Sequence, residues 1–265
     1  MRDQCKRTGS LLLLFFSFFL FKSALPASFN VRPIMIFINY RRPITYLKLK
    51  NQGRHSYRFQ VRLYSWKQTL IGKMLLKPAH SLIYFPRLLS IPPGRTRIIR
   101  IGSELPTARV EKSYRLLVRQ LSTSTAPGQG VSFLLAMSVP VFILPQNQIM
   151  KGKISNLKVS HQIFSFSFVN SGSIYYTPQQ ILVTGTTGNG KKIFSKKLMG
   201  WYVLPGESRI EQVKLPAAVC GKIKKIKISA KVNYFLLKGR RLNKGGSFTR
   251  FMTAHFVLPE NGCLP

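Results

Sequence analysis

Apolar and polar residues alternate along most of the chain, and no segment keeps a helical period for long. The alternation is clearest over residues 57–66, where one phase is aromatic or aliphatic and the other is mostly polar. Such period-two patterns, bounded by turn residues, predict half-buried β-strands. The same signs predict one extended, β-rich stretch at residues 29–38 and strands at residues 44–50, 82–85, 88–91, 96–101, 113–121 and 131–143. Short strands in this number and spacing are typical of a Greek-key sandwich of immunoglobulin type.

The pattern stops at residues 145–148 and then restarts with shorter, more basic strands that continue to residue 257. We therefore predict an all-β fold of two immunoglobulin-like β-sandwich domains in series, with a boomerang outline if they pack at an angle. The predicted divisions are a signal peptide at 1–27, an N-terminal domain at 28–147 and a C-terminal domain at 148–265.

Residues 131–143 are the longest predicted strand of the first half, an uncharged apolar run that contains Pro140. A proline cannot donate to a β-ladder, so it indicates an edge strand or a bulge. Proteins normally blunt a long apolar edge because it can pair with other chains. The run is therefore either a core strand or a strand kept open for a partner. The preceding residues 122–130 have the composition of a flexible loop.

The N-terminal segment has the features of a secretory signal peptide. Three basic residues precede the apolar run 11–21, and small residues follow, with Ala27 as a plausible last residue before cleavage. The alternative is an uncleaved membrane anchor, but the run is short for a span and ends at Lys22. We expect the mature protein to be soluble and outside the cytoplasm.

The chain is strongly basic, with 42 Lys and Arg against 6 Asp and Glu and a net charge of +36. Such a charge favours anionic surfaces, including nucleic acids, phospholipid head groups and acidic proteins. The one dense basic run, KIKKIK at residues 222–227, has interleaved Ile residues and indicates the solvated face of a strand. No nucleic-acid-binding motif is present, so we expect no nucleic-acid partner.

Catalytic chemistry finds little support in the sequence. Asp3 is the only aspartate and lies in the predicted signal peptide, and no GxSxG motif occurs. The glycine-rich residues 185–190 lack the ending of a phosphate-binding loop. The histidines are isolated, without metal-ligand spacing. We expect no enzyme activity, no catalytic residues, no metal, no cofactor and no small-molecule substrate.

Cys220 and Cys263 remain once the signal peptide, which contains Cys5, has been removed. An even pair in an oxidising compartment predicts one disulfide. Metal binding is the weaker alternative, because no CxxC motif or neighbouring histidine cluster accompanies the pair.

Three blocks of the sequence resemble the periplasmic pilus chaperones of the chaperone–usher pathway, the PapD-like family. They are IPPGRTRIIRI at residues 91–101, EKSYRL at 111–116 and SVPVF at 138–142. The same resemblance is supported by YRFQV at residues 57–61 with Trp66 and, in the second half, by GWYVLPG at residues 200–206. The archaic, spore-coat-U-associated branch looks most similar.

The resemblance implies that the chain binds pilin-like or spore-coat-U-like protein subunits in the periplasm and delivers them to an outer-membrane usher. A pilin subunit of this pathway is an immunoglobulin-like fold without its last strand, and the chaperone lends an edge strand that fills the groove. We expect the groove-filling side chains to be Val131, Phe133, Leu135 and Met137.

The family also holds the terminal carboxylate of the subunit with basic residues between its domains. At the usual positions this chain has Met35 and Ser138. The substitute candidates are Arg100 and Arg115, because a buried guanidinium can bind a carboxylate through two hydrogen bonds. The alternative is that these arginines pair with nearby glutamates or are solvated.

A second function remains open on the sequence alone, that of a secreted basic β-sandwich protein that adheres to anionic surfaces. The two functions differ in their response to salt. Adhesion by charge weakens steeply as salt rises, whereas strand addition into an apolar groove does not.

Overall fold

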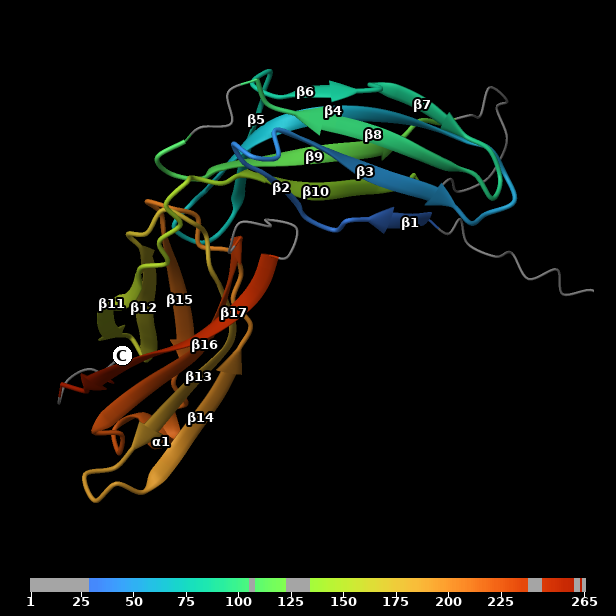
Figure 1. Ribbon diagram of the computed structural model, residues 1–265. Coiled ribbons are helices and arrows are strands. Elements are labelled where there is room, and N and C mark those ends of the chain that lie inside the picture. Colours follow the sequence, from blue (N-terminus) through green and yellow to red (C-terminus); the bar gives the residue numbers. More distant parts are fainter. Residues whose placement is uncertain (1–28, 105–107, 123–133, 238–244, 260–262, 264–265) are drawn as a thin grey trace, which may run out of the picture.

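The computed structural model describes residues 29–104, 108–122, 134–237, 245–259 and 263 (Figure 1). The predicted signal peptide, most of the predicted loop at 122–130, and Val131 and Phe133 lie outside these residues. The described chain is all-β apart from the single-turn helix α1, Ala217–Cys220, and this confirms the predicted fold class.

The first part of the chain forms two facing sheets. One has the strand order β1-β3-β8-β6, and the other has the order β2-β10-β9-β4-β5, with β7 also paired to β4. The strands are β1 Phe29–Arg32, β2 Ile36–Ile38, β3 Ile44–Asn51, β4 Tyr57–Gln68, β5 Met74–Pro78, β6 Ile83–Phe85, β7 Leu88–Ile91, β8 Thr96–Gly102, β9 Lys112–Gln120 and β10 Ala136–Ile143. We call this pair of sheets the first sandwich.

The rest of the chain forms the second sandwich. Its sheets have the orders β11-β12-β15 and β14-β13-β16-β17. The strands are β11 Gly152–Ser160, β12 Ile163–Asn170, β13 Thr177–Thr186, β14 Lys192–Leu198, β15 Ser208–Lys214, β16 Lys225–Leu237 and β17 Gly245–Val257.

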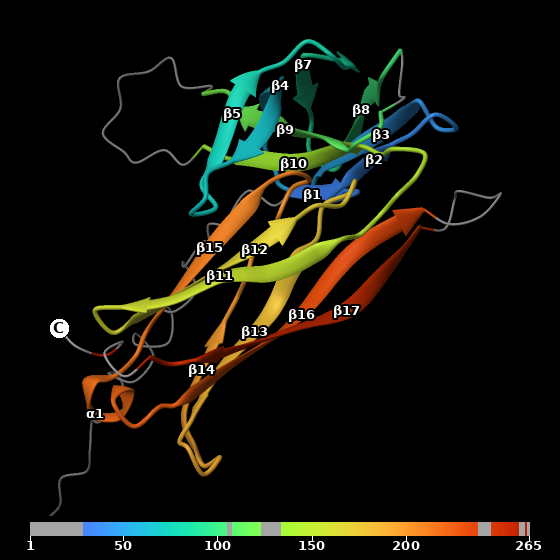
Figure 2. The same cartoon turned by 90° about the vertical axis from the view of Figure 1, so that its left-hand side faces the viewer.

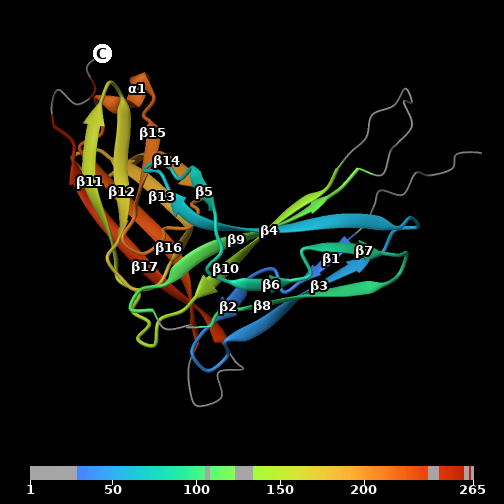
Figure 3. The same ribbon diagram turned by 90° about the horizontal axis from the view of Figure 1, so that it is seen from above.

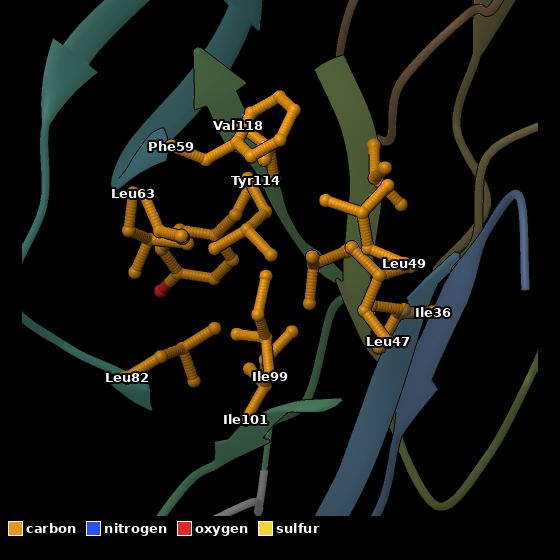
Figure 4. Close-up of a cluster of buried hydrophobic side chains, with 14 of the residues drawn as sticks. Ile36, Leu47, Leu49, Phe59, Leu63, Leu82, Ile99, Ile101, Tyr114 and Val118 are labelled. Carbon is orange, nitrogen blue, oxygen red and sulfur yellow. The ribbon is translucent and has the colours of Figure 1, made fainter. Parts of the chain in front are cut away.

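Because apolar and polar residues alternate along the strands, every second side chain points into the space between the two sheets of its sandwich. In the first sandwich the inward phase supplies Leu47 and Leu49 from β3, Ile99 and Ile101 from β8, and Phe59 from β4, all at most 1% exposed (Figure 4). The second sandwich has its own core, which includes Phe164, Phe166 and Phe168 of β12. Each sandwich therefore has the interior of an independent domain.

A third apolar cluster joins the two sandwiches. Trp66, Phe142 and Leu144 contribute from the first, and Ile174, Tyr175 and Leu204 from the second. We call this set the junction cluster. The sandwiches meet there at an angle, which gives the molecule a bent outline (Figures 1 and 3).

Two predicted segments differ from the observed elements. Residues 29–38 were predicted as one extended stretch, but β1 and β2 belong to different sheets and are separated at Pro33. The basic run 222–227 was predicted to be strand throughout, but β16 begins only at Lys225, because α1 and a turn occupy the residues before it. In both places a local break separates residues of similar composition.

Candidate functional site

Strand β10 has one open flank over its first half. It pairs with β9 along its whole length, antiparallel, from Ala136 to Ile143. On its other side it pairs with β2, in parallel, only from Val141 to Ile143. Within the described part of the chain, no strand covers the second flank of residues 136–140.

Alternate backbone groups of β10 point to the open flank. The N–H of Gln120 donates to Leu135 O at 2.8 Å, so the odd-numbered positions face β9. The N–H of Leu144 donates to Ile38 O at 2.8 Å, so the even-numbered positions face the other way. Ala136 and Ser138 therefore present N–H groups to the open flank. Pro140, which has no N–H, stands where the pairing with β2 begins.

The side chains of this segment fall into two phases. Met137 is half-buried and packs against the core of the first sandwich, and Leu135 is also half-buried. Ala136 and Ser138 are exposed on the opposite phase. Because Val131 and Phe133 lie outside the described residues, the predicted groove-filling role of the four odd-numbered residues stays a prediction.

Arg115 lies between the two sandwiches on β9. Its side chain is 5% exposed, and its Cζ lies 3.8 Å from the ring centre of Trp66 and 5.6 Å from that of Tyr202. Its Nε and Nη2 atoms are buried and have no hydrogen-bond partner among the described residues. Burial lowers the pKa of the guanidinium, but an arginine keeps its charge. A buried cation with unused donors is suited to hold a carboxylate.

Arg100 is placed elsewhere. It is exposed on β8, and it points away from the core because its neighbours Ile99 and Ile101 are fully buried. β8 and β9 belong to different sheets, so the structure does not bring Arg100 and Arg115 together. Of the two predicted anchors, only Arg115 lies where the sandwiches meet.

An open cleft of about 480 Å³ adjoins the junction, and Tyr202 is common to the cleft and to the surroundings of Arg115. Its walls include Met35, Tyr175, Trp201 and Tyr234. The hydroxyls of Tyr175 and Tyr202 both donate to the Met35 sulfur, at 3.7 and 3.4 Å. A thioether is a weak acceptor, so these two hydroxyls are available to a stronger one.

Hydrogen bonds fix the angle between the sandwiches. Gln68, at the end of β4, donates from its backbone N–H to Glu207 Oε2 at 2.8 Å and from Nε2 to Tyr202 O at 2.9 Å. Its Oε1 accepts from Leu204 N at 3.1 Å. Ile210 N donates to Leu70 O at 2.7 Å. With this number of direct bonds, the cleft has walls of defined geometry.

Glu111 is buried at the same junction. Its backbone N–H donates to Ser173 O at 2.9 Å, and its carboxyl group accepts from Ser113 Oγ at 3.3 Å and from Tyr175 N at 3.4 Å. Burial raises its pKa to about 8, against the smaller lowering effect of these two hydrogen bonds. Near neutral pH the Glu111 carboxyl group is therefore mostly protonated.

The predicted disulfide is present between Cys220, just before the turn into β16, and Cys263. Among the residues with described positions, no group of three or more His, Cys, Asp or Glu is placed to hold a metal ion. A search of the same residues finds no helix long and apolar enough to cross a membrane.

Sequence reasoning missed how Trp66, Gln68, Tyr175 and Tyr202 come together. Trp66 and residues 200–206 were noted only as parts of the family resemblance. A cluster of aromatic residues at strand ends, just where the alternation stops, is the signal that could have indicated a junction. The hydrogen bonds of Gln68 had no sequence signal, because a glutamine at a strand end is common.

Residues 28–148 match the family described as pili and flagellar-assembly chaperone, PapD N-terminal domain. No curated protein sequence matches the chain. Several solved structures have the same fold. The YadV chaperone superposes with a TM-score of 0.56 at 12% identity, covering 86% of this chain and 99% of its own.

Two complexes also contain a similar chain. The pre-assembly complex of the CsuC chaperone and the CsuE tip adhesion subunit, from archaic Csu pili of Acinetobacter baumannii, gives a TM-score of 0.50 at 20% identity, with 71% and 91% coverage. The complex of Salmonella enterica SafA pilin with the SafB chaperone gives 0.51 at 14% identity, with 89% and 99% coverage. The family match covers the first sandwich, which resembles the N-terminal domain of PapD-like pilus-assembly chaperones, and the chain as a whole shares the fold of these solved chaperones.

Proposed function

We propose that this protein is a periplasmic chaperone, not an enzyme, that binds pilin-like subunits by strand addition and delivers them to an outer-membrane usher. The open flank of β10 carries the proposal. Ala136 and Ser138 offer their N–H groups there, in an uncharged segment that a foreign strand can approach. The Csu and Saf complexes support it, since each pairs a chaperone of this fold with a pilus subunit.

Arg115 is our candidate for the anchor of the subunit's terminal carboxylate. The unused Nε and Nη2 donors support this role, and the Tyr175 and Tyr202 hydroxyls border the adjoining cleft. Arg100 keeps its predicted role only if a subunit also reaches the outer face of β8.

The finer assignments rest on the sequence blocks. We propose that the chain belongs to the archaic branch and that its subunits are spore-coat-U-like. We also propose that residues 1–27 are the signal peptide, 28–147 the domain that lends its strand and 148–265 the C-terminal domain. The groove-filling set is then Val131, Phe133, Leu135 and Met137.

Co-expression with a candidate subunit tests the function, and a one-to-one complex is the expected product. The sharpest variant is Ser138→Pro, which removes an N–H from the open flank without removing a bond to β9. We expect at least about tenfold weaker capture, because a ladder bond is lost and its partner carbonyl is left unpaired. Ser138→Ala is the matched control and should bind normally. Equal capture by both variants would exclude strand addition at this flank.

A further inference from the structure

The face of the sheet β14-β13-β16-β17 that points away from the second core has lysines arranged in rows across the strands. On β16, Ile226, Ile228 and Ala230 are fully buried in the second core, so the residues between them point outward. The pairing register then places outward residues of all four strands in rows across the sheet. The rows are Lys192, Thr186, Lys225 and Val257; Ser195, Thr184, Lys227 and His255; Lys197, Leu182, Ser229 and Thr253; and Gln180, Lys231 and Phe251.

We call Lys192, Lys197, Lys225, Lys227 and Lys231 the lysine face. Neighbouring strands lie about 4.8 Å apart, and outward residues on one strand about 6.8 Å apart. No acidic residue lies on these four strands in the part of the chain that the structure describes. The described glutamates are in the first sandwich or on the side of β15. The positive charges of this face are therefore not neutralised from within the sheet.

The lysine face looks into the bend of the molecule. In Figure 1 this sheet lies on the inner side of the second sandwich, and Figure 2 shows β11, β12 and β15 on the outer side. The border of the first sandwich that contains β10 faces the same space (Figures 1 and 2). The face is also continuous with the cleft, because Gln180 and Asn233 belong both to the outer phase of the sheet and to the cleft wall.

We infer that the lysine face is a second contact surface for the subunit that β10 completes, and that it selects subunits with an acidic surface on the side turned toward the second sandwich. The inference rests on the proposed function and adds the chemistry of the partner. It also gives a role to the KIKKIK run, since Lys225 and Lys227 belong to the face.

The dimensions of the bend favour a subunit as the occupant. A domain of about 100 residues has a radius of gyration of about 13 Å, so a subunit held on β10 can reach across the lysine rows. A flat membrane would have to enter the inner side of the angle, where the first sandwich blocks it. Phe251, 72% exposed beside Lys231, adds an apolar contact of the kind found in protein interfaces.

Charge at such a surface acts mainly on the rate of encounter. Complementary fields raise association rates and make them dependent on salt, while close apolar pairing sets the dissociation rate. Strand addition at β10 and attraction at the lysine face are therefore separable in one experiment. The first should persist at high salt, and the second should disappear once the screening length falls to a few ångströms.

The test uses the subunit isolated in the one-to-one complex and the full chaperone. The variant Lys197→Gln/Lys227→Gln/Lys231→Gln removes three charges from the face. The control Lys153→Gln/Lys158→Gln/Lys214→Gln removes three exposed lysines from the outer sheet. At low salt we expect the association rate of the first variant to fall about tenfold and that of the control to change little. In 0.5 M salt both should match the wild type, and thermal unfolding should confirm that both are folded.

Three outcomes would overturn the inference. The first is an unchanged association rate in the face variant, and the second is an equal loss in both variants. The third is normal subunit capture together with lost binding to phosphatidylglycerol vesicles, which would assign the face to a membrane. Each leaves the proposed function intact if Ser138→Pro still weakens capture and Ser138→Ala does not. If the wild type forms no complex at all, the proposed function fails and the inference fails with it.

Discussion

The partly open strand β10 of the first sandwich and the edge strand β14 of the second have opposite chemistry. β10 carries no charge from Ala136 to Ile143, and its flank is open over residues 136–140. β14 also lies at the border of its sheet, but it contains Lys192, Lys196 and Lys197. Lysines on an edge strand discourage pairing with another chain, whereas an uncharged edge permits it.

The same contrast extends to what holds each sandwich together. The second sandwich is closed by the disulfide Cys220–Cys263, and the first sandwich contains no cysteine. The first is instead tied to its neighbour through Gln68 and the junction cluster. The second sandwich is thus closed covalently, and the first contains the strand with a partly open flank.

The largest expected effect is on stability, when the disulfide of the second sandwich is removed. Replacing both disulfide cysteines by alanine, Cys220→Ala/Cys263→Ala, frees a loop of 43 residues. The chain-entropy argument gives a loss of about 4 kcal/mol in the free energy of unfolding. Urea unfolding of the variant and the wild type measures it. Folded variant protein should still capture subunits, because the open flank of β10 is in the other sandwich; a loss below about 1 kcal/mol would show that the sandwich is closed by packing alone.

The next largest expected effect is a loss of subunit binding when Arg115 is replaced. Arg115→Met keeps the volume against Trp66 but removes the charge, and we expect about 2 kcal/mol or more of binding free energy to be lost. Arg100→Met is the matched control on the outer face of β8 and should bind normally. Calorimetric titration with purified subunit compares them. Normal binding by the Arg115 variant would remove it from the anchor role, and weak binding by the Arg100 variant would place the carboxylate elsewhere.

The sequence predicted the architecture well because alternation and turn residues are local signals, and each sandwich follows from them. It left β10 as either a core strand or an open edge. The structure contains both, since residues 141–143 are flanked on two sides and residues 136–140 on one. Pro140, at the change between them, was the residue that indicated an edge.

The site itself was less predictable, because it depends on how the two sandwiches meet. Arg100 and Arg115 both occupy strands in family-like blocks, and nothing in their local pattern separates an exposed arginine from one stacked on Trp66. Distant segments such as Gln68 and residues 202–204 come together only through inter-sandwich packing. Local periodicity carries no information about such contacts.

A smaller effect is expected on the pH dependence of stability, through Glu111 at the junction. Glu111 has an ordinary pKa near 4.5 when unfolded and about 8 when buried in the folded protein. The folded state therefore holds a proton that the unfolded state releases, so the stability contributed by this group falls as the pH rises from about 4.5 to 8. We expect Glu111→Gln to show a flatter fall over this window in chemical unfolding. Some slope should remain, because burial also raises the pKa of Glu207 and Glu211. An unchanged slope would mean that Glu111 is ionised in the folded state.

The smallest effect tests the contrast between the borders directly. Lys192→Thr/Lys196→Thr/Lys197→Thr gives β14 an uncharged edge that resembles β10. Because an unprotected edge pairs with a second copy, we expect weak, concentration-dependent dimerisation in sedimentation experiments. Removal of three lysines from the outer sheet, at positions 153, 158 and 214, controls for the change in net charge. If both triple variants dimerise equally, the lysines act through overall repulsion and not through protection of the edge. If only the β14 variant dimerises, charge at a sheet border is what separates the closed sandwich from the open one.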